Sequence, residues 1–348
     1  MYLYIFGFCY LLAIIMEESS AKTKLLVLQI LCFVLAVLAG ARDPYTWADA
    51  PVYYIGFTNY TNDLFGFSFY DEPFGYSEKG FYLLGVIIKT FTNNGTTYFI
   101  VLSLISFFLL YRFLRRFCIF PLLGLSVYIS RFMFARHYVQ IRAGLAYLIV
   151  LFAIQYVKER NWKMYFGMVL IAYLFHRSAI IAVPLYFLGM VRFTKWHILM
   201  GLAVAFILGA FFQDQLKTIV SDNASDLEIY SYTVGKEIQE AKGLRNPMIY
   251  YQTIILLAYT FGEKRLKHSS IYYYTIRDGY FISTFILVAF SMFLGLSGRT
   301  SSLFATLEII IIPSFVHLFR KRNKMFAYLG IGVVLTIVFY MKYKSSLG

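Results

Sequence analysis

The feature that most constrains this chain is a series of long apolar runs separated by short basic clusters. Hydrophobic side chains make up 60% of the 348 residues, and charged side chains make up only 14%. Soluble domains have about a quarter of their residues charged. Lipid must therefore solvate much of the surface, and we expect an all-α polytopic membrane protein.

About twelve apolar runs fit membrane-spanning helices, although several are nearer to about 15 than to 20 residues. The predicted spans lie near residues 1–16, 24–41, 96–112, 117–134, 141–157, 163–175, 178–191, 196–213, 247–262, 276–296, 302–319 and 326–342. We find no soluble domain between them, so residues 1–348 are expected to form a single transmembrane domain.

The distribution of lysine and arginine predicts the orientation, because basic residues favour cytoplasmic loops. The short basic clusters are Arg112/Arg115/Arg116, Lys158/Arg160/Lys163, Arg192/Lys195, Lys264/Arg265/Lys267 and Arg320/Lys321/Arg322/Lys324. All can be cytoplasmic together only if both termini are extracytoplasmic and residues 42–95 do not cross the membrane. We therefore interpret the short apolar stretch near 80–92 as a re-entrant or interfacial helix. Sizeable outer loops then lie near 42–95 and 214–246.

The net charge of +14 does not indicate a nucleic-acid partner. The basic residues are scattered between apolar runs and are better interpreted as anchors that face anionic lipid. The three cysteines lie in or beside apolar stretches, which argues against a disulfide framework or a zinc site. No Asp-x-Asp motif occurs in the outer segments, and no phosphate-binding glycine loop is visible. We expect neither a metal nor a cofactor.

Five arginines break the charge pattern, because they fall at or near the outer ends of spans. They are Arg131, Arg136, Arg142, Arg177 and Arg299. Each could extend to phospholipid headgroups, which is the common role of an isolated arginine at a membrane surface. If Arg42, Arg136, Arg142 and Arg299 share one face, a common anionic ligand explains these four better. Guanidinium groups suit the oxygens of phosphate and pyrophosphate.

Other polar side chains on the same side are candidates for catalysis or sugar binding. Asp49 and Tyr53 are four residues apart and share a face if that segment is helical, although a solvated loop aspartate is the simpler interpretation. His176 ends a span and could accept a proton, or could only cap a helix. Glu72 and Glu78 could bind sugar hydroxyls or act as a base, and Glu78 could equally cap the next helix.

Read in order, these residues form a pattern of short motifs. The pattern consists of Gly40-x-Arg42, Asp49 with Tyr53, Glu78-Lys-Gly80-Phe81, Arg136, Gln140-Ile-Arg142-Ala-Gly-Leu-Ala146, Phe175-His176-Arg-Ser178-Ala and a late Arg299. It resembles the EpsG family of Wzy-type polysaccharide polymerases from position 40 to about position 305. The chain departs from the family pattern at Arg136-His137, where we would expect an asparagine, and this leaves the individual role of Arg136 open.

The resemblance implies a GT-C-like helical fold in the bacterial plasma (inner) membrane. The implied substrates are oligosaccharide repeat units on polyprenyl pyrophosphate, normally undecaprenyl pyrophosphate, as both donor and acceptor. The growing glycan would move from its carrier onto the non-reducing end of the incoming unit, which extends O-antigen of lipopolysaccharide, capsule or exopolysaccharide. Membrane lipids and a chain-length regulator protein are the other partners that the resemblance implies.

Within this reaction the arginines are expected to stabilise the leaving pyrophosphate. We expect Arg142 and Arg299 to bind the donor pyrophosphate with help from Arg136. Arg42 is expected to pair either with Asp49 or with the acceptor's pyrophosphate.

The proton of the acceptor hydroxyl would pass to His176, Asp49 or Glu78. We rank His176 first, because its span end should adjoin that of Arg142. The expected glycan-binding residues are Tyr53, Gln140 and Glu72.

Two rival functions bind the same anion. A flippase for lipid-linked oligosaccharides needs charged residues at mid-membrane and on both faces, whereas those of this chain gather outside. A polysaccharide ligase differs from a polymerase only in its acceptor. A structural scaffold would explain the apolar runs but not the misplaced arginines.

Overall fold

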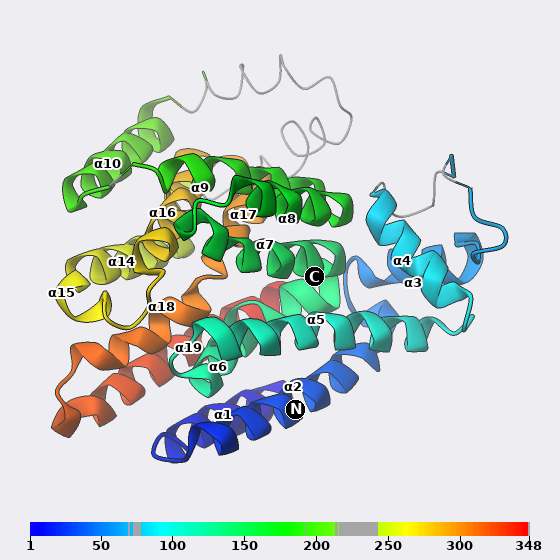
Figure 1. Cartoon of the computed structure of the whole chain (residues 1–348), viewed down its shortest axis with the longest axis horizontal. Helices are drawn as coiled ribbons and strands as arrows, with labels where there is room; N and C mark the ends of the chain where they lie inside the picture. The colour runs from blue at the N-terminus through cyan, green and yellow to red at the C-terminus, as the bar shows by residue number, and fades with distance from the viewer. Residues whose placement is uncertain (69, 72–77, 192, 213–214, 216–242, 347–348) are drawn as a thin grey trace.

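The computed structural model describes residues 1–68, 70–71, 78–191, 193–212, 215 and 243–346. Within these ranges every regular element is a helix (Figure 1). The predicted all-α class is therefore confirmed.

A helix occupies each predicted span. These helices are α1 (Tyr2–Ile15), α2 (Ala21–Gly40), α5 (Gly95–Phe117), α6 (Pro121–Arg131), α7 (Ile141–Lys158), α8 (Trp162–Phe175), α9 (Val183–Leu188), α10 (Lys195–Phe211), α14 (Pro247–Phe261), α16 (Tyr273–Ala289), α18 (Glu308–Ser314) and α19 (Lys324–Ser346). Shorter elements lie between them, namely α3 (Ala50–Tyr60), α4 (Lys79–Lys89), α15 (Glu263–Leu266), α17 (Leu294–Ala305), a π-helix (Phe134–Val139) and a 3-10 helix (Arg177–Ala182).

Four helices of the described chain are long and apolar enough to cross a membrane, and a bent pair brings the number to five. The four are Ala21–Gly40, Gly95–Phe117, Ile141–Lys158 and Lys321–Ser346. These helices are those of a membrane protein. The total of about twelve spans and the GT-C-like architecture stay predictions.

The largest difference from the predicted spans concerns residues 276–296 and 302–319. Helix α16 ends at Ala289, and α17 begins at Leu294. The segment Ser297–Ala305 then bends by 52° against Glu308–Leu318. Serine and threonine hydroxyls in this segment bond to backbone carbonyls, as in the bond from Ser302 Oγ to the carbonyl of Arg299 (2.8 Å). Arg299 consequently lies inside a short helix rather than in a link between two spans.

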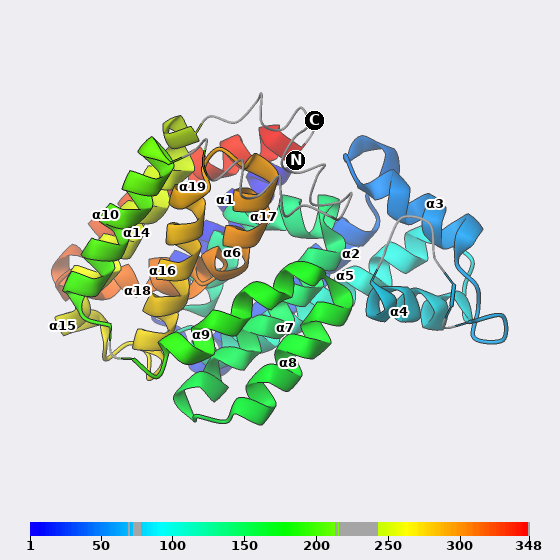
Figure 2. The same cartoon turned by 90° about the horizontal axis from the view of Figure 1, so that it is seen from above.

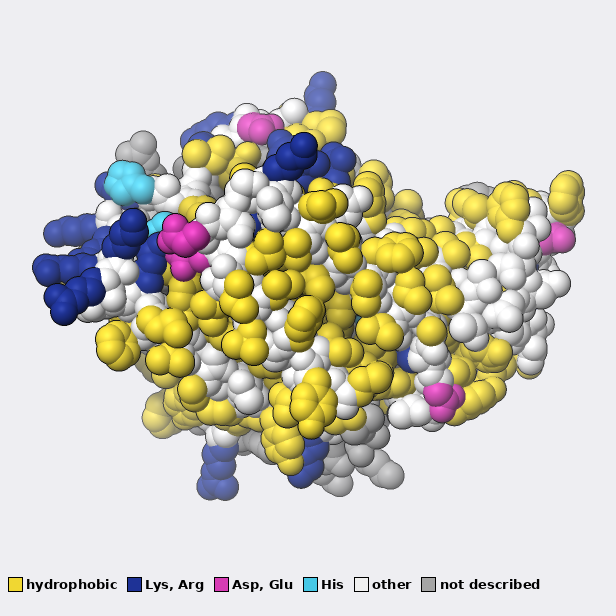
Figure 3. Space-filling model, turned by 90° about the horizontal axis from the view of Figure 1, so that it is seen from below, with side chains coloured by type: hydrophobic (Ala, Val, Ile, Leu, Met, Phe, Trp, Pro, Cys, Tyr) yellow, Lys and Arg dark blue, Asp and Glu magenta, His cyan; other side chains and the backbone are white. Residues whose placement is uncertain are grey.

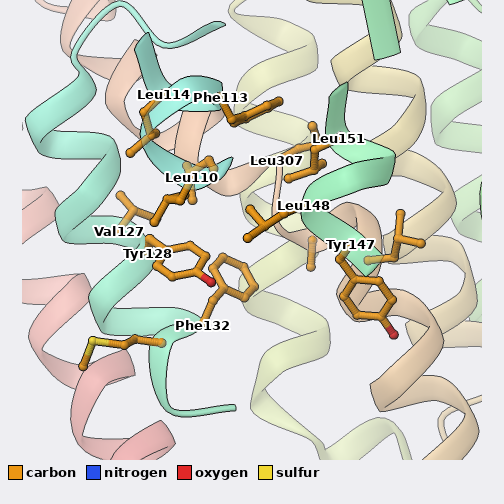
Figure 4. Close-up of a cluster of buried hydrophobic side chains, with 14 of the residues drawn as sticks. Leu110, Phe113, Leu114, Val127, Tyr128, Phe132, Tyr147, Leu148, Leu151 and Leu307 are labelled. Carbon is orange, nitrogen blue, oxygen red and sulfur yellow. The ribbon is translucent and has the colours of Figure 1, made fainter. Parts of the chain in front are cut away.

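The core is formed where α5, α6 and α7 meet (Figure 4). Its side chains include Leu110, Phe113, Leu114, Val127, Tyr128, Phe132, Leu148, Leu151 and Leu307, all of them buried. Around this core α2 packs along α5, α8 along α7, and α17 along α16. The outer helices carry exposed apolar side chains such as Phe33 and Val333, as expected for surfaces that contact lipid. Apolar side chains cover the middle of the face in Figure 3.

The basic loops meet at one end of the molecule. Lys324 at the start of α19 forms an ion pair with Glu17 between α1 and α2 (2.6 Å). The ring of Tyr272 contacts Phe117 at the end of α5 (5.3 Å) and the ammonium group of Lys158 at the end of α7 (5.6 Å). Figure 3 shows lysine and arginine gathered at this end. The predicted clustering of these loops on one side is thus seen in the fold.

Both termini lie at the opposite end. The ring of Tyr2 contacts Trp47 (6.2 Å), Phe134 (5.4 Å) and Tyr343 near the C-terminus (5.9 Å). Figures 1 and 2 show α3 and α4 projecting from the bundle at one end. This arrangement is compatible with two extracytoplasmic termini, and the orientation in a membrane stays a prediction.

The short helix predicted near 80–92 corresponds to α4, which has 11 residues. At about 1.5 Å per residue it is about 17 Å long, too short for a hydrocarbon core of about 30 Å. It packs on α8 and α5. Most of the second predicted outer loop, 214–246, lies outside the described residues.

Candidate functional site

A cationic pocket of about 310 Å³ opens between the π-helix, α14, α17 and α19. Arg131, Arg136, Arg299 and Lys342 line it together with Gln140, and no acidic residue is among the described residues that line it. The sequence predicted Arg136, Arg299 and Gln140 as site residues, and the fold brings all three to this pocket. Four basic side chains around one cavity favour an anion, although Glu308, 3.5 Å from Arg131 Nε, offsets part of the charge of Arg131.

Arg136 is held rigidly in the wall of this pocket. It is only 2% exposed, and its Nη2 donates to the carbonyl of Ser302 (2.6 Å) and to Thr306 Oγ1 (2.8 Å). Its guanidinium carbon lies 4.3 Å from the centre of the Tyr147 ring. The residue belongs to the π-helix, a local widening of helical geometry that often marks functional sites.

Gly144 allows α7 to approach the π-helix closely. A Cβ atom at this position would lie 2.6 Å from the carbonyl oxygen of Arg136. The glycine in the Gln140-Ile-Arg142-Ala-Gly motif therefore sets the spacing between Arg136 and Arg142, which stand on the two adjacent elements.

Arg142 lies in the first turn of α7 and forms an ion pair with Glu78 through its Nη1. Its Nε donates to the hydroxyl of Tyr53 (3.1 Å). A cation at a helix N-terminus is electrostatically unfavourable, and the carboxylate of Glu78 offsets this. The side chains of Arg142 and Glu78 are 19% and 5% exposed. We call Arg142, Glu78, Tyr53 and His176 the carboxylate cluster.

Glu78 reaches this cluster because α4 packs tightly on the end of α8. A Cβ atom at Gly80 would lie 2.7 Å from the carbonyl oxygen of Leu174. The second oxygen of Glu78 accepts a hydrogen bond from the backbone N–H of Arg177 (3.4 Å). The carboxylate is thus fixed between the start of α7 and the segment that follows α8.

His176 is held by Ser178 in the same segment. Its Nδ1 accepts from the backbone N–H of Ser178 (3.2 Å) and lies 2.6 Å from Ser178 Oγ. The pKa of His176 is lowered to about 4, mainly by burial, with Glu78 opposing the shift and Arg142 adding to it. The imidazole is neutral at pH 7 and, with Nδ1 accepting, carries its proton on Nε2.

Tyr147 connects the carboxylate cluster with the cationic pocket. Its hydroxyl donates to the carbonyl of Arg299 and contacts Ser178 Oγ, each at 2.8 Å. Its ring lies under the guanidinium of Arg136. The pocket and the cluster are therefore two halves of one site, at the end of the molecule that holds both termini.

Arg42 is not in this site. It turns inward, where its Nη1 donates to the carbonyl of Ala39 (2.6 Å) and its guanidinium lies 4.1 Å from the centre of the Phe99 ring. Burial lowers its pKa to about 10. Arg42 forms these contacts and no ion pair with Asp49 in the described chain. The expected pairing with Asp49 is therefore wrong, and the alternative expectation, that Arg42 pairs with the acceptor's pyrophosphate, stays a prediction. Asp49 precedes α3, half-buried and without a capping hydrogen bond from its side chain. Glu72 lies outside the described residues.

Arg131, Lys342 and Glu308 belong to the site but were not predicted as site residues. Glu308 is fully buried and lies 3.5 Å from Arg131 Nε. Tyr280 donates to one of its oxygens (3.0 Å), and Tyr251 donates to the other (3.2 Å). An acid inside an apolar run and a lysine at the outer end of the last predicted span are both signals of function.

A second polar cavity of about 800 Å³ lies at the end with the basic loops. Lys158, Arg160 and Lys195 line it, but Glu263 and Asp278 line it as well. Its charges are therefore mixed, unlike those of the cationic pocket. A single multiply charged anion fits the cationic pocket better.

Comparison with known proteins identifies one relationship. The model of the EpsG family matches residues 25–348, nearly the whole chain. No curated protein and no solved structure matches the chain. Every residue of the cationic pocket and of the carboxylate cluster falls within the matched range.

Proposed function

The chain belongs to the EpsG family and is thus a polysaccharide polymerase-type membrane protein; we propose that it is a Wzy-like glycosyltransferase at the outer face of the bacterial plasma membrane. It transfers a growing glycan from polyprenyl pyrophosphate onto the non-reducing end of a lipid-linked repeat unit. The observation that carries this proposal is the cationic pocket beside a buried carboxylate.

In the reaction, the bond between the anomeric carbon and the pyrophosphate oxygen of the donor breaks. The electron pair stays on that oxygen, and the acceptor hydroxyl forms the new bond to the anomeric carbon. The hydroxyl loses its proton to a base. The charge that develops on the pyrophosphate is the main electrostatic cost, and fixed cations in a site with little water stabilise it best.

Arg136 and Arg299 bind the donor pyrophosphate, and Arg131 and Lys342 complete its shell. Arg136 is fixed by α17 through Ser302 and Thr306, so it needs little rearrangement when the anion forms. Loss of one such donor costs about 10²–10³-fold in turnover in well-studied enzymes. The reaction then proceeds without a divalent metal.

Glu78 is the base that the geometry favours among the three candidates. Its carboxylate is fixed by the ion pair with Arg142 and by the hydrogen bond from the backbone N–H of Arg177. Because Nδ1 of His176 accepts a hydrogen bond from Ser178, Nε2 carries the proton and can donate a hydrogen bond to an oxygen of the substrate. In this proposal Arg142, which the sequence led us to expect at the donor pyrophosphate, instead orients Glu78 towards the acceptor, because it is paired with that carboxylate. Tyr53 and Gln140 remain candidates for binding the sugars, and Asp49 remains an alternative base.

The test uses purified protein in detergent with chemically defined lipid-linked repeat units. We expect polymer, with one polyprenyl pyrophosphate released for each new bond. Lipid that binds but is never polymerised by the wild-type protein would refute the proposal.

The second cavity at the basic end is the observation that favours a flippase. Between the two cavities, however, α16 is packed tightly, with Ile276, Tyr280 and Thr284 fully buried. A proteoliposome assay separates the functions, because a flippase moves intact lipid-linked units and forms no glycosidic bond.

A further inference from the structure

A wholly apolar groove of about 400 Å³ lies between α14 and α19 and extends to Phe319 and Phe326 at the basic end. Ile254, Ile255, Gly330 and Val334 line its sides. Several of its side chains are open to the surroundings, including Ile254 at 66% and Phe326 at 69% exposure. The catalytic proposal makes no use of this groove.

The groove and the cationic pocket are both lined by α14 and α19. On α14, Met248 and Gln252 line the pocket, and Tyr251 and Ile255 line the groove. On α19, Lys342 lines the pocket, and the stretch from Val334 back to Phe326 lines the groove. On α14 these residues are three or four apart and share a face, whereas on α19 the buried Val338 lies between Lys342 and Val334. Each helix thus contributes to a polar cavity towards one end and to an apolar cavity towards the other.

A single chain of contacts joins the two cavities. Tyr251 lines the groove and donates from its hydroxyl to Glu308 (3.2 Å). Glu308 lies 3.5 Å from Nε of Arg131, which lines the pocket. The hydroxyl of Tyr251 is therefore engaged away from the groove, which leaves the lining of the groove apolar.

We infer that the groove binds the isoprenoid tail of the donor, with the pyrophosphate in the cationic pocket. This inference rests on the proposed function. The path along α19 from Lys342 to Phe326 is about 24 Å at about 1.5 Å per residue, most of a hydrocarbon core of about 30 Å. An amphiphile with a multiply charged head and a long apolar tail matches both the charge at one end and the apolar lining at the other.

Gly330 offers a clean way to block the groove. A Cβ atom at Gly330 meets no atom within 4 Å, so a larger side chain projects into the open groove without displacing the fold. Gly167 on α8 provides the matched control, because a Cβ atom there also meets nothing within 4 Å and the residue does not line the groove. The two variants are Gly330→Phe and Gly167→Phe.

The experiment measures binding of a long-chain polyprenyl pyrophosphate and of farnesyl pyrophosphate to each purified variant. We expect Gly330→Phe to weaken long-chain binding by at least about tenfold, since each buried methylene contributes to affinity. It should leave farnesyl pyrophosphate binding close to wild type, which also reports correct folding. Gly167→Phe should bind both as the wild-type protein does. Unchanged long-chain binding by Gly330→Phe would overturn the inference.

A second measurement uses the wild-type protein and a long-chain polyprenyl pyrophosphate with a photoreactive diazirine on its tail. We expect labelled peptides from α14 and α19. Labels confined to other helices would place the tail elsewhere and overturn the inference. Labelling of α14 and α19 that excess phosphatidylglycerol removes would show that the groove binds membrane lipid in general, and this would overturn the inference as well. If the wild-type protein forms polymer, the proposed function stands whatever the binding and labelling results are. If the wild-type protein forms no polymer, the proposed function itself is refuted.

Discussion

The substitution Gly144→Ala tests whether the close approach of α7 to the π-helix matters for function. A Cβ atom would lie 2.6 Å from the carbonyl oxygen of Arg136, and ordinary contact begins at 3.4 Å, so the two elements must separate by 0.8 Å (3.4 − 2.6). The obstructing atom belongs to the backbone, so no side-chain rotation relieves it. The π-helix that carries Arg136 must move relative to the α7 turn that carries Arg142.

The expected effect on activity is much larger than the effect on stability. Alanine in a helix is favoured over glycine by about 0.5–1 kcal/mol, and overpacking costs about 1–3 kcal/mol. The net change in the free energy of unfolding is therefore between near zero and about 2.5 kcal/mol of destabilisation. A displacement of about 1 Å in a catalytic constellation costs about 10²-fold in rate, which is the loss we expect in polymer formation.

Gly167→Ala is the control, because its new Cβ atom meets nothing within 4 Å. It should raise stability by about 0.5–1 kcal/mol and leave polymer formation unchanged. Thermal unfolding in detergent and the polymer ladder from membranes report the two quantities. Wild-type ladders from Gly144→Ala, or equal losses of activity in both variants, would refute the reasoning.

Four further outcomes follow from the same geometry. Arg136→Ala and Arg299→Ala should each leave monomeric lipid-linked units and no ladder, and a wild-type ladder from either removes that arginine from the pyrophosphate site. Glu78→Gln should reduce turnover by about 10²-fold or more and cost about 3 kcal/mol of stability by leaving Arg142 without its carboxylate; a fully active variant would exclude Glu78 as the base. The pKa of His176 is about 4 when folded and about 6.5 when unfolded, so the unfolded chain binds more protons and stability falls as the pH drops from 6.5 to 4. The melting temperature should show this, and His176→Gln should flatten the slope; an unchanged slope contradicts the assignment. Polymerisation by purified protein should continue in excess EDTA, and a loss that magnesium restores would contradict a metal-independent reaction.

The sequence was sufficient to place the helices and most of one site. The apolar runs predicted the positions of the helices, and the basic clusters predicted which loops lie at the same end of the bundle. Both patterns are readable because they reflect the solvent around each segment. The same reasoning identified Arg136 and Arg299, since a cation at the wrong end of a span needs a partner. The motif glycines Gly80 and Gly144 explain why short motifs carried the resemblance, as each marks a place where two backbones nearly touch.

Other features depend on packing that no local pattern encodes. The inward turn of Arg42 onto Phe99 depends on a ring from another helix. The bend between α17 and α18 moves Arg299 into a helix, although its neighbours have the composition of a loop. Lys342 is separated from Arg136 by most of the C-terminal half of the chain, and only the packing of α19 beside the π-helix brings both to one pocket.

The central claim is that the cationic pocket holds the donor pyrophosphate, and an experimental structure with bound polyprenyl pyrophosphate tests it most directly. The protein in a lipid nanodisc should show both phosphates within hydrogen-bond distance of Arg136 and Arg299. Phosphates bound instead in the cavity lined by Lys158, Arg160 and Lys195, at the opposite end of the molecule, would contradict the claim.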